Sequence, residues 1–264
     1  MNPEALLERF SEQHVLAFAL VLARVAPLFL LAPLFSSKSF PARVRGVTAV
    51  ALAIGISPVA AHAVGEGTIP ADIWGLAALV GKELLVGMAF SFGIAALFAA
   101  LAAAGAILDL SIGFMLGGVV DPLSGTQSSL LQQLYTMVGV LVFIAIGGDG
   151  WVIAGLARTY EAVPLLESPE LGSITAAAQL AFSGIFTAAV QVCAPVLLAL
   201  VLTDAALGVV SKVVPQINVF AVGFPAKIAV GLLLVGASLP FAAGWLSDEL
   251  QRSVTTALQS LRVA

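Results

Sequence analysis

Few residues in this chain have side chains that could do covalent chemistry, and their spacing matches no catalytic motif. Asp109 and Asp121 lie twelve residues apart, and paired carboxylates can act as general acid and base or bind a cation. Asp121 precedes a proline, however, which is typical of a turn, so we favour a cap or turn role for both aspartates. The sequence has no Gly-Lys-Ser/Thr phosphate loop, no plausible Ser-His-Asp set and no His-Glu-x-x-His motif. We therefore expect a protein that is not an enzyme and needs no cofactor.

The residues that most often bind metals are also scarce. His14 and His62 are the two histidines, and their spacing to other ligands indicates no metal site. Cys193 is the single cysteine, so it cannot form a disulfide within the chain. Because it lies in an apolar stretch, we interpret it as a small buried hydrophobic residue.

The composition is that of a membrane protein. Of 264 residues, 60% are hydrophobic and 10% are charged, and the mean hydropathy is +1.09. Soluble domains carry about 25% charged residues, and a soluble fold of this size could not bury so much apolar surface. The sequence therefore predicts a polytopic all-α membrane protein. The net charge of −4 and the lack of a basic run do not favour nucleic-acid binding.

About six long helices are expected. They cover residues 15–35, 46–64, 73–108, 128–146, 171–203 with a possible extension to 212, and 228–246. Short amphipathic helices are predicted at 4–13 and at 247–264, where Ser247 could be the N-cap. Residues 147–150 are predicted to form a flexible turn, and the polar residues 158–173 a loop outside the hydrocarbon.

Four charged residues fall inside the apolar segments: Arg24, Lys82, Glu83 and Asp204. Charges in such positions mark either a substrate or proton pathway or an interhelical bond, and for Arg24 we favour the bond. Adjacent helical residues lie about 100° apart, so Lys82 and Glu83 are not expected to pair with each other. Each is expected to find a partner on another helix or to reach the membrane interface.

A glycine-rich stretch interrupts the helices between the third and the fourth. Irregular backbone cannot face lipid, because its N–H and C=O groups would have no partners there. It must be buried in protein or line a polar cavity, so we predict a plug or gate of a pore. Phe114 and Met115 could instead be ordinary packing residues. The predicted plug comprises Gly113, Phe114, Met115, Leu116, Gly117, Gly118, Val119, Asp121 and Pro122.

Prolines and lysines bracket residues 212–227, which are predicted to form the tip of a helical hairpin. The lysines of this tip and the three cations of the loop 36–45 would lie on one side of the membrane. By the positive-inside rule that side is the cytoplasm, with both termini outside. The tip residues singled out are Pro215, Gln216, Asn218, Phe220, Gly223 and Pro225.

Three pieces of the sequence together resemble one protein family. They are Arg24-Val-Ala-Pro27 through Pro33 with Phe40-Pro-Ala-Arg43, Ile112-Gly-Phe-Met through Val120-Asp-Pro122, and Ala206-Leu-Gly through Pro215-Gln-Ile-Asn-Val-Phe-Ala-Val-Gly-Phe-Pro225. These pieces, in this order, are similar to the flagellar biosynthesis protein FliR family. Members of that family are export-gate subunits, and their injectisome relatives belong to type III secretion.

The resemblance implies an architecture and a set of partners. A single membrane domain would comprise a FliP-like part at 14–173, a FliQ-like hairpin at 174–246 and a tail at 247–264. The partners would be FliP-like and FliQ-like gate subunits, an FlhB-like switch protein and unfolded export substrates. The location would be the bacterial inner membrane, in the flagellar basal body. The resemblance also implies that the loop between the middle helices fills the closed pore, and that some predicted spans are buried against partners.

The expected function is therefore that of a flagellar export-gate subunit that helps to form and plug a protein conduit. An injectisome gate is the nearest alternative. A stand-alone secondary transporter would use Arg24, Lys82, Glu83 and Asp204 as substrate or proton sites. An intramembrane transferase would use Asp109 and Asp121, but it would need a richer acidic motif.

Overall fold

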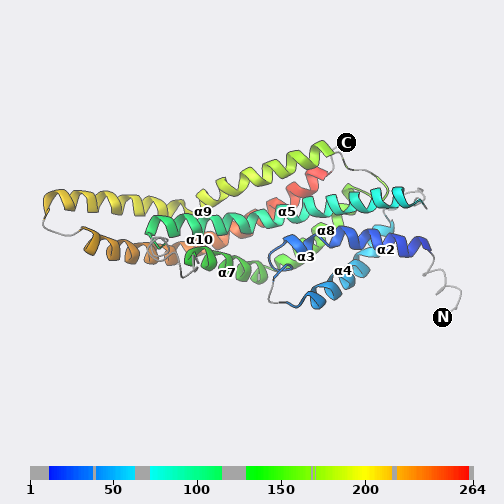
Figure 1. Ribbon diagram of the computed structural model, residues 1–264, viewed down its shortest axis with the longest axis horizontal. Coiled ribbons are helices and arrows are strands. Elements are labelled where there is room, and N and C mark those ends of the chain that lie inside the picture. The colour runs from blue at the N-terminus through cyan, green and yellow to red at the C-terminus, as the bar shows by residue number, and fades with distance from the viewer. Residues whose placement is uncertain are drawn as a thin grey trace. The chain divides into compact units, whose positions relative to one another are not determined.

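The computed structural model describes residues 12–37, 40–62, 72–114, 129–167, 169, 171–215 and 219–261. All regular secondary structure in these residues is helical, as the sequence predicted (Figure 1). The helices are α2 (Glu12–Val25), α3 (Leu28–Leu31), α4 (Ala42–His62), α5 (Ile73–Ile112), α7 (Leu130–Ala145), α8 (Gly148–Ala162), α9 (Leu171–Val213) and α10 (Val219–Leu261).

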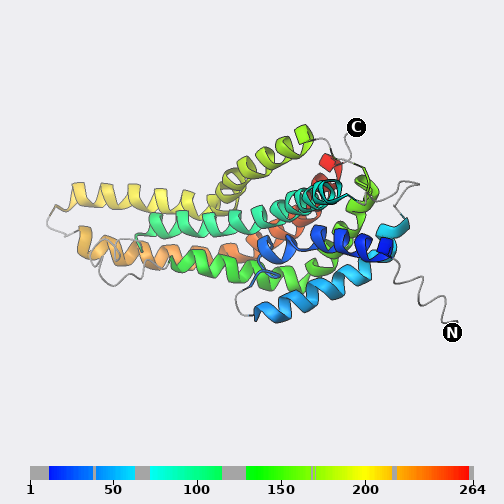
Figure 2. The same cartoon turned by 45° about the vertical axis from the view of Figure 1, so that its right-hand side comes forward.

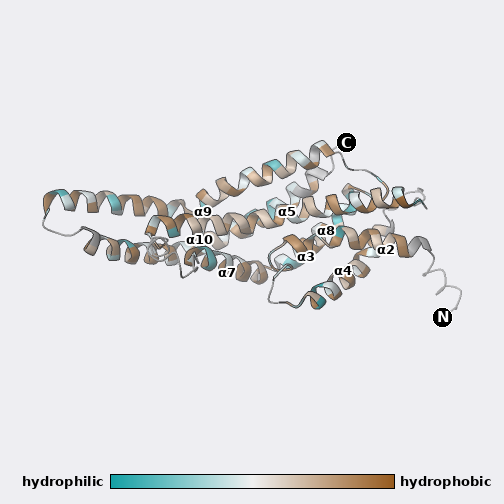
Figure 3. Cartoon of the chain, viewed as in Figure 1, coloured by the Kyte–Doolittle hydropathy of each residue, from teal (hydrophilic) through white to brown (hydrophobic). Residues whose placement is uncertain are grey.

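Several of these helices suit a membrane. Among the described residues, four (α4, α5, α9 and α10) are long and apolar enough to cross a bilayer, and the bent pair α7 and α8 would be a fifth. Most residues of these helices are hydrophobic (Figure 3). The polytopic all-α class is confirmed, although six long helices were expected.

Proline divides the first predicted span. The segment 15–35 is not one helix, because α2 ends at Val25 and the short α3 begins at Leu28. Pro27 lies at the break, where its missing N–H cannot continue the ladder of hydrogen bonds. The helix ends again before Pro33, as expected of a residue that has no N–H donor for a helix.

The helix α5 continues without a break for 40 residues. At 1.5 Å per residue it is about 60 Å long, which exceeds the roughly 30 Å of a hydrocarbon core. It ends at Gly113, where φ is 100°. The N–H groups of Gly113 and Phe114 both donate to the carbonyl oxygen of Asp109, which satisfies the end of the helix.

The prediction for residues 147–173 was partly wrong. The chain does turn at Gly147, where φ is 68° and the helical structure breaks between α7 and α8. However, α8 begins at Gly148 and continues to Ala162, so residues 158–162 are helical and not part of a loop. The reason is a helical pattern of buried side chains, which includes Val152, Leu156 and Tyr160.

The predicted hairpin tip is also shorter than expected. Since α9 ends at Val213 and α10 begins at Val219, Phe220, Gly223 and Pro225 belong to α10 and not to the tip. An apolar helix can continue through a proline where its neighbours satisfy the freed carbonyl group. Pro215 lies in the connection, whereas Gln216 and Asn218 are outside the described residues.

The described part of the predicted tail, residues 247–261, is not a separate helix, because α10 is continuous to Leu261. Ser247 is therefore an interior helical residue and not an N-cap. The apolar side predicted for the tail is present, since Leu250 and Val254 are buried. Together with Leu246 they continue one buried stripe of α10 at a spacing of four residues.

The chain forms two compact units. The first contains Met1–Ala95, Gly147–Ala181 and Leu250–Ala264, and within it α4 packs against α2 and α8. The second contains Ala96–Ile146 and Phe182–Glu249. Within the second unit, α9 and α10 lie side by side and antiparallel, as the views in Figures 1 and 2 agree. The family-based division of the chain at 173 and 246 stays a prediction.

Candidate functional site

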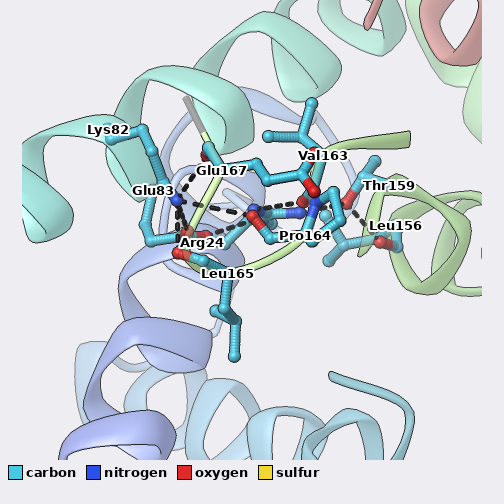
Figure 4. A network of polar contacts seen from close by, with 9 residues as sticks. All are labelled: Arg24, Lys82, Glu83, Leu156, Thr159, Val163, Pro164, Leu165 and Glu167. Carbon is cyan, nitrogen blue, oxygen red and sulfur yellow. Dashed lines mark hydrogen bonds and ion pairs between the residues drawn. The ribbon is translucent and has the colours of Figure 1, made fainter. Parts of the chain in front are cut away.

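The first unit contains a buried cluster of polar groups (Figure 4). Arg24 comes from α2, and Lys82 and Glu83 come from α5. Their side chains meet the segment that joins α8 to α9, which we call the connector and define as residues 163–167. Three of the four intramembrane charges predicted from the sequence are therefore in one place.

Arg24 is completely buried, and its guanidinium donors are occupied on three sides. Nε lies 2.5 Å from Oε2 of Glu83, Nη1 donates to Oγ1 of Thr159 at 3.3 Å, and Nη2 donates to the carbonyl oxygen of Val163 at 2.9 Å. The Tyr160 ring adds a cation–π contact, 4.0 Å from the guanidinium carbon to the ring centroid. This agrees with the interhelical bond that we favoured for Arg24.

Lys82 faces the connector. Its ammonium group donates to the carbonyl oxygens of Leu165 and Glu167, the latter at 2.8 Å. It also lies 3.0 Å from Oε1 of Glu83. The expectation that adjacent residues would not pair was therefore wrong. The reason is the flexible four-carbon stem of lysine, which lets the ammonium group reach a neighbouring carboxylate although the two Cβ atoms diverge.

The cluster carries two buried cations for one buried carboxylate, that of Glu83, whereas the carboxylate of Glu167, which also attracts Lys82, belongs to an exposed residue. An unbalanced buried charge is costly unless polar groups solvate it. Backbone carbonyl groups of the connector supply this solvation for both cations. Sequence reasoning missed these acceptors, because a main-chain carbonyl has no side-chain signature. The one available signal was the unusual polarity of residues 158–173.

A glycine brings the helices together at the cluster. A Cβ atom on Gly87 would clash with the backbone carbonyl oxygen of Arg24. Only a residue without a side chain lets α5 approach α2 this closely. The approach places Glu83, one turn earlier on α5, beside Arg24.

A second polar centre lies in the second unit, where Asp109 caps α7. Its carboxylate accepts hydrogen bonds from the hydroxyl of Ser129, from the N–H of Leu131 at 3.0 Å and from the N–H of Gln132 at 3.2 Å. The carboxylate is fully buried at the positive end of the helix dipole of α7. The cap role predicted for Asp109 is therefore confirmed, and the helix that it caps is α7, the next one after α5 among the described residues.

Asp109 and Ser129 flank the predicted plug. Of the plug residues, Gly113 is buried and Phe114 is half-buried at the end of α5. The others (Met115, Leu116, Gly117, Gly118, Val119, Asp121 and Pro122) lie outside the described residues. Their role stays a prediction.

Asp204, the remaining charge that was predicted to lie inside the membrane, is in the second unit. Its carboxylate lies 2.7 Å from the ammonium group of Lys227, which joins α9 to α10. Asp204 is about half exposed, so the pair is only partly shielded from its surroundings. Among the described residues, no group of three or more histidine, cysteine, aspartate or glutamate side chains could bind a metal ion.

The long apolar helices and the internally paired charges define a polytopic membrane protein. The model of the family described as "Bacterial export proteins, family 1" matches residues 15–253. The chain is 29% identical over 222 residues to the flagellar biosynthetic protein FliR of Escherichia coli (strain K12), with 84% of each chain covered. It is 30% identical over 222 residues to FliR of Bacillus subtilis (strain 168), covering 83% of this chain and 84% of the relative.

The surface presentation of antigens protein SpaR of Salmonella typhimurium is 29% identical over 230 residues, covering 86% of this chain and 84% of the relative. The chain therefore belongs to this family of bacterial export proteins, and the likeness to FliR noted in its motifs is confirmed.

Proposed function

We propose that the chain is a subunit of a type III protein export gate in the bacterial inner membrane, where it helps to form the conduit for flagellar proteins. The observation that carries this proposal is the family match over residues 15–253. Relatives named FliR favour a flagellar gate. A relative named SpaR aligns over a similar share of the chain, so an injectisome gate is the second candidate.

The partners in this proposal are FliP-like and FliQ-like subunits and an FlhB-like switch protein. Large apolar side chains on α9 support the need for neighbours, because Phe182, Phe186 and Leu202 are each about 60% exposed. Such an extended apolar surface must be covered by lipid or by protein. On this view residues 14–173 take the place of a FliP-like subunit and residues 174–246 that of a FliQ-like hairpin.

In this proposal, residues 113–122 form the seal of the closed conduit. Phe114, Met115, Leu116 and Val119 would form an apolar seal, and the glycines would allow the segment to withdraw. Two features support this assignment. The segment lies between α5 and α7 in the sequence. Asp109 links these two helices, because its carboxylate at the end of α5 accepts hydrogen bonds from residues at the start of α7.

Purification of the tagged chain from its own host in mild detergent tests this function. We expect a ring-sized complex with several small membrane proteins, identified by mass spectrometry. A monomer that binds a small solute would contradict the proposal and support a stand-alone transporter. The identities of the partners would decide between a flagellar gate and an injectisome gate.

A further inference from the structure

We propose that the ammonium group of Lys82 holds the connector in place by filling a cage of oxygen atoms. We further propose that this cage binds a small primary ammonium ion when the lysine side chain is removed. The cage consists of the carbonyl oxygens of Leu165 and Glu167 and Oε1 of Glu83. The carbonyl oxygen of Pro164 lies further out, 3.5 Å from Nζ.

Lys82 finds a hydrogen-bond acceptor for each of its donors in the connector. A lysine ammonium group has three N–H donors and no acceptor, and Nζ donates to the carbonyl oxygens of Pro164, Leu165 and Glu167. Oε1 of Glu83, 3.0 Å away on α5, adds the opposite charge without a hydrogen bond. Lys82 is 8% exposed, so the charge is almost fully withdrawn from solvent and depends on these oxygen atoms.

The connector, which supplies most of the cage, is neither helix nor strand. Val163 and Leu165 are buried. Two backbone hydrogen bonds help to order the connector: the N–H of Val163 donates to the carbonyl oxygen of Thr159 in α8, and the N–H of Glu167 donates to the carbonyl oxygen of Pro164. Carbonyl groups buried without donors are costly. Without a cation in the cage, the connector would have to turn its carbonyl groups towards water.

Arg24 cannot replace Lys82 in the cage. Its donors already serve Oε2 of Glu83, Thr159 and Val163. The two cations therefore hold different parts of the connector, Arg24 its first residue, Val163, and Lys82 the residues Pro164, Leu165 and Glu167. In the proposed gate, and resting on that function, the connector links the FliP-like part to the FliQ-like hairpin, so its position would set where the hairpin begins.

The test uses hydrogen exchange of residues 160–170 in the full chain, purified in detergent with its associated subunits. In Lys82→Met, which keeps the bulk but not the charge, we expect connector amides to exchange at least about tenfold faster than in the parent protein. In Lys82→Ala, propylammonium should restore slow exchange. Tetramethylammonium at equal ionic strength should not, because it has the charge but no N–H donors.

Lys227→Met is the matched control, because it removes another ion-paired lysine and should leave the connector unchanged. Exchange in α7, measured in the same samples, reports whether the rest of the fold is intact. If Lys82→Met and Lys82→Ala do not accumulate, Lys82→Gln is used, because it keeps N–H donors without a charge and should give an intermediate exchange rate.

Two results would overturn the proposal. One is parent-like connector exchange in Lys82→Met or Lys82→Gln, and the other is equal rescue by tetramethylammonium and propylammonium. Neither result would contradict the proposed export function, which is tested separately by the composition of the purified complex. Conversely, a chain that purifies alone would still show the exchange pattern if the cage is correct.

Discussion

Replacing Glu83 by alanine is expected to lower the free energy of unfolding by about 3–5 kcal/mol, because it leaves buried cations without their counter-ion. Arg24 is completely buried and Lys82 is nearly so, and both lie within 3.0 Å of the Glu83 carboxylate. Thermal or denaturant unfolding of the purified protein in detergent measures the loss. Glu83→Gln should show most of the same effect, since it keeps an oxygen acceptor but removes the charge.

Two further variants separate the charge effect from a packing effect. The double variant Arg24→Met/Glu83→Met removes both members of the central pair and should be more stable than Glu83→Ala. Arg43 is exposed at the start of α4, and Arg43→Gln should change stability by less than about 0.5 kcal/mol. Parent-like stability of Glu83→Ala would show that the cluster does not hold the first unit together.

Alanine at Gly105 is the second change with a large expected effect. A Cβ atom there would lie 2.5 Å from the carbonyl oxygen of Leu131 and 2.5 Å from Cα of Gln132. These are backbone atoms, so α5 and α7 would have to separate, at a cost of about 1–3 kcal/mol or more. The separation would also weaken the capping of α7, because Asp109 lies one turn further along α5.

Gly81→Ala is the matched control for Gly105→Ala. It lies in the same helix, and a Cβ atom there would meet nothing within 4 Å. Since alanine is a better helix former than glycine, this variant should be neutral or more stable by up to about 1 kcal/mol. Unfolding of both variants in the same detergent measures the difference. Equal stability of the two would mean that α5 and α7 are not in close contact at Gly105.

Some of this packing could be predicted from the sequence. Residues 99–106 are nearly all alanine and glycine, a composition that favours a close approach of helices, and Gly105 lies at such a contact with α7. The composition predicted a membrane protein, and apolar segments of about 20 residues predicted helices, because a spanning helix satisfies its own backbone groups. An interhelical partner for Arg24 could be expected as well, since a charge in an apolar helix needs compensation.

Other features could not be predicted because they depend on tertiary contacts. The polarity of residues 158–161 suggested a loop, but Thr159 and Tyr160 are buried at the end of α8 beside Arg24. Pro225 suggested the end of a hairpin tip, but it lies within α10. At Thr159 and Tyr160, packing around Arg24 outweighed the local preference of the residues. Pro225 is exposed, and an apolar helix can continue through a proline where neighbouring groups satisfy the freed carbonyl group.

Of the features described, the cage around Lys82 was the least predictable from the sequence. Its acceptors are mostly backbone carbonyl groups of residues 80 or more positions away in the chain. Any residue type presents such a group, so no motif could reveal them. The functional assignment rests instead on motifs spread through the whole chain, which match the region that the family covers.

Ion leakage through the assembled gate is the most direct test of the claim that this chain helps to form a plugged conduit. Residues 113–119 would be deleted, and the membrane conductance of cells or of reconstituted complexes would be measured. If the segment seals the conduit, the deletion will leave the complex assembled and raise its ion conductance, and replacing Gly117 and Gly118 will do so to a smaller extent. A fully assembled complex that lacks residues 113–119 and conducts no more than the parent would contradict the claim.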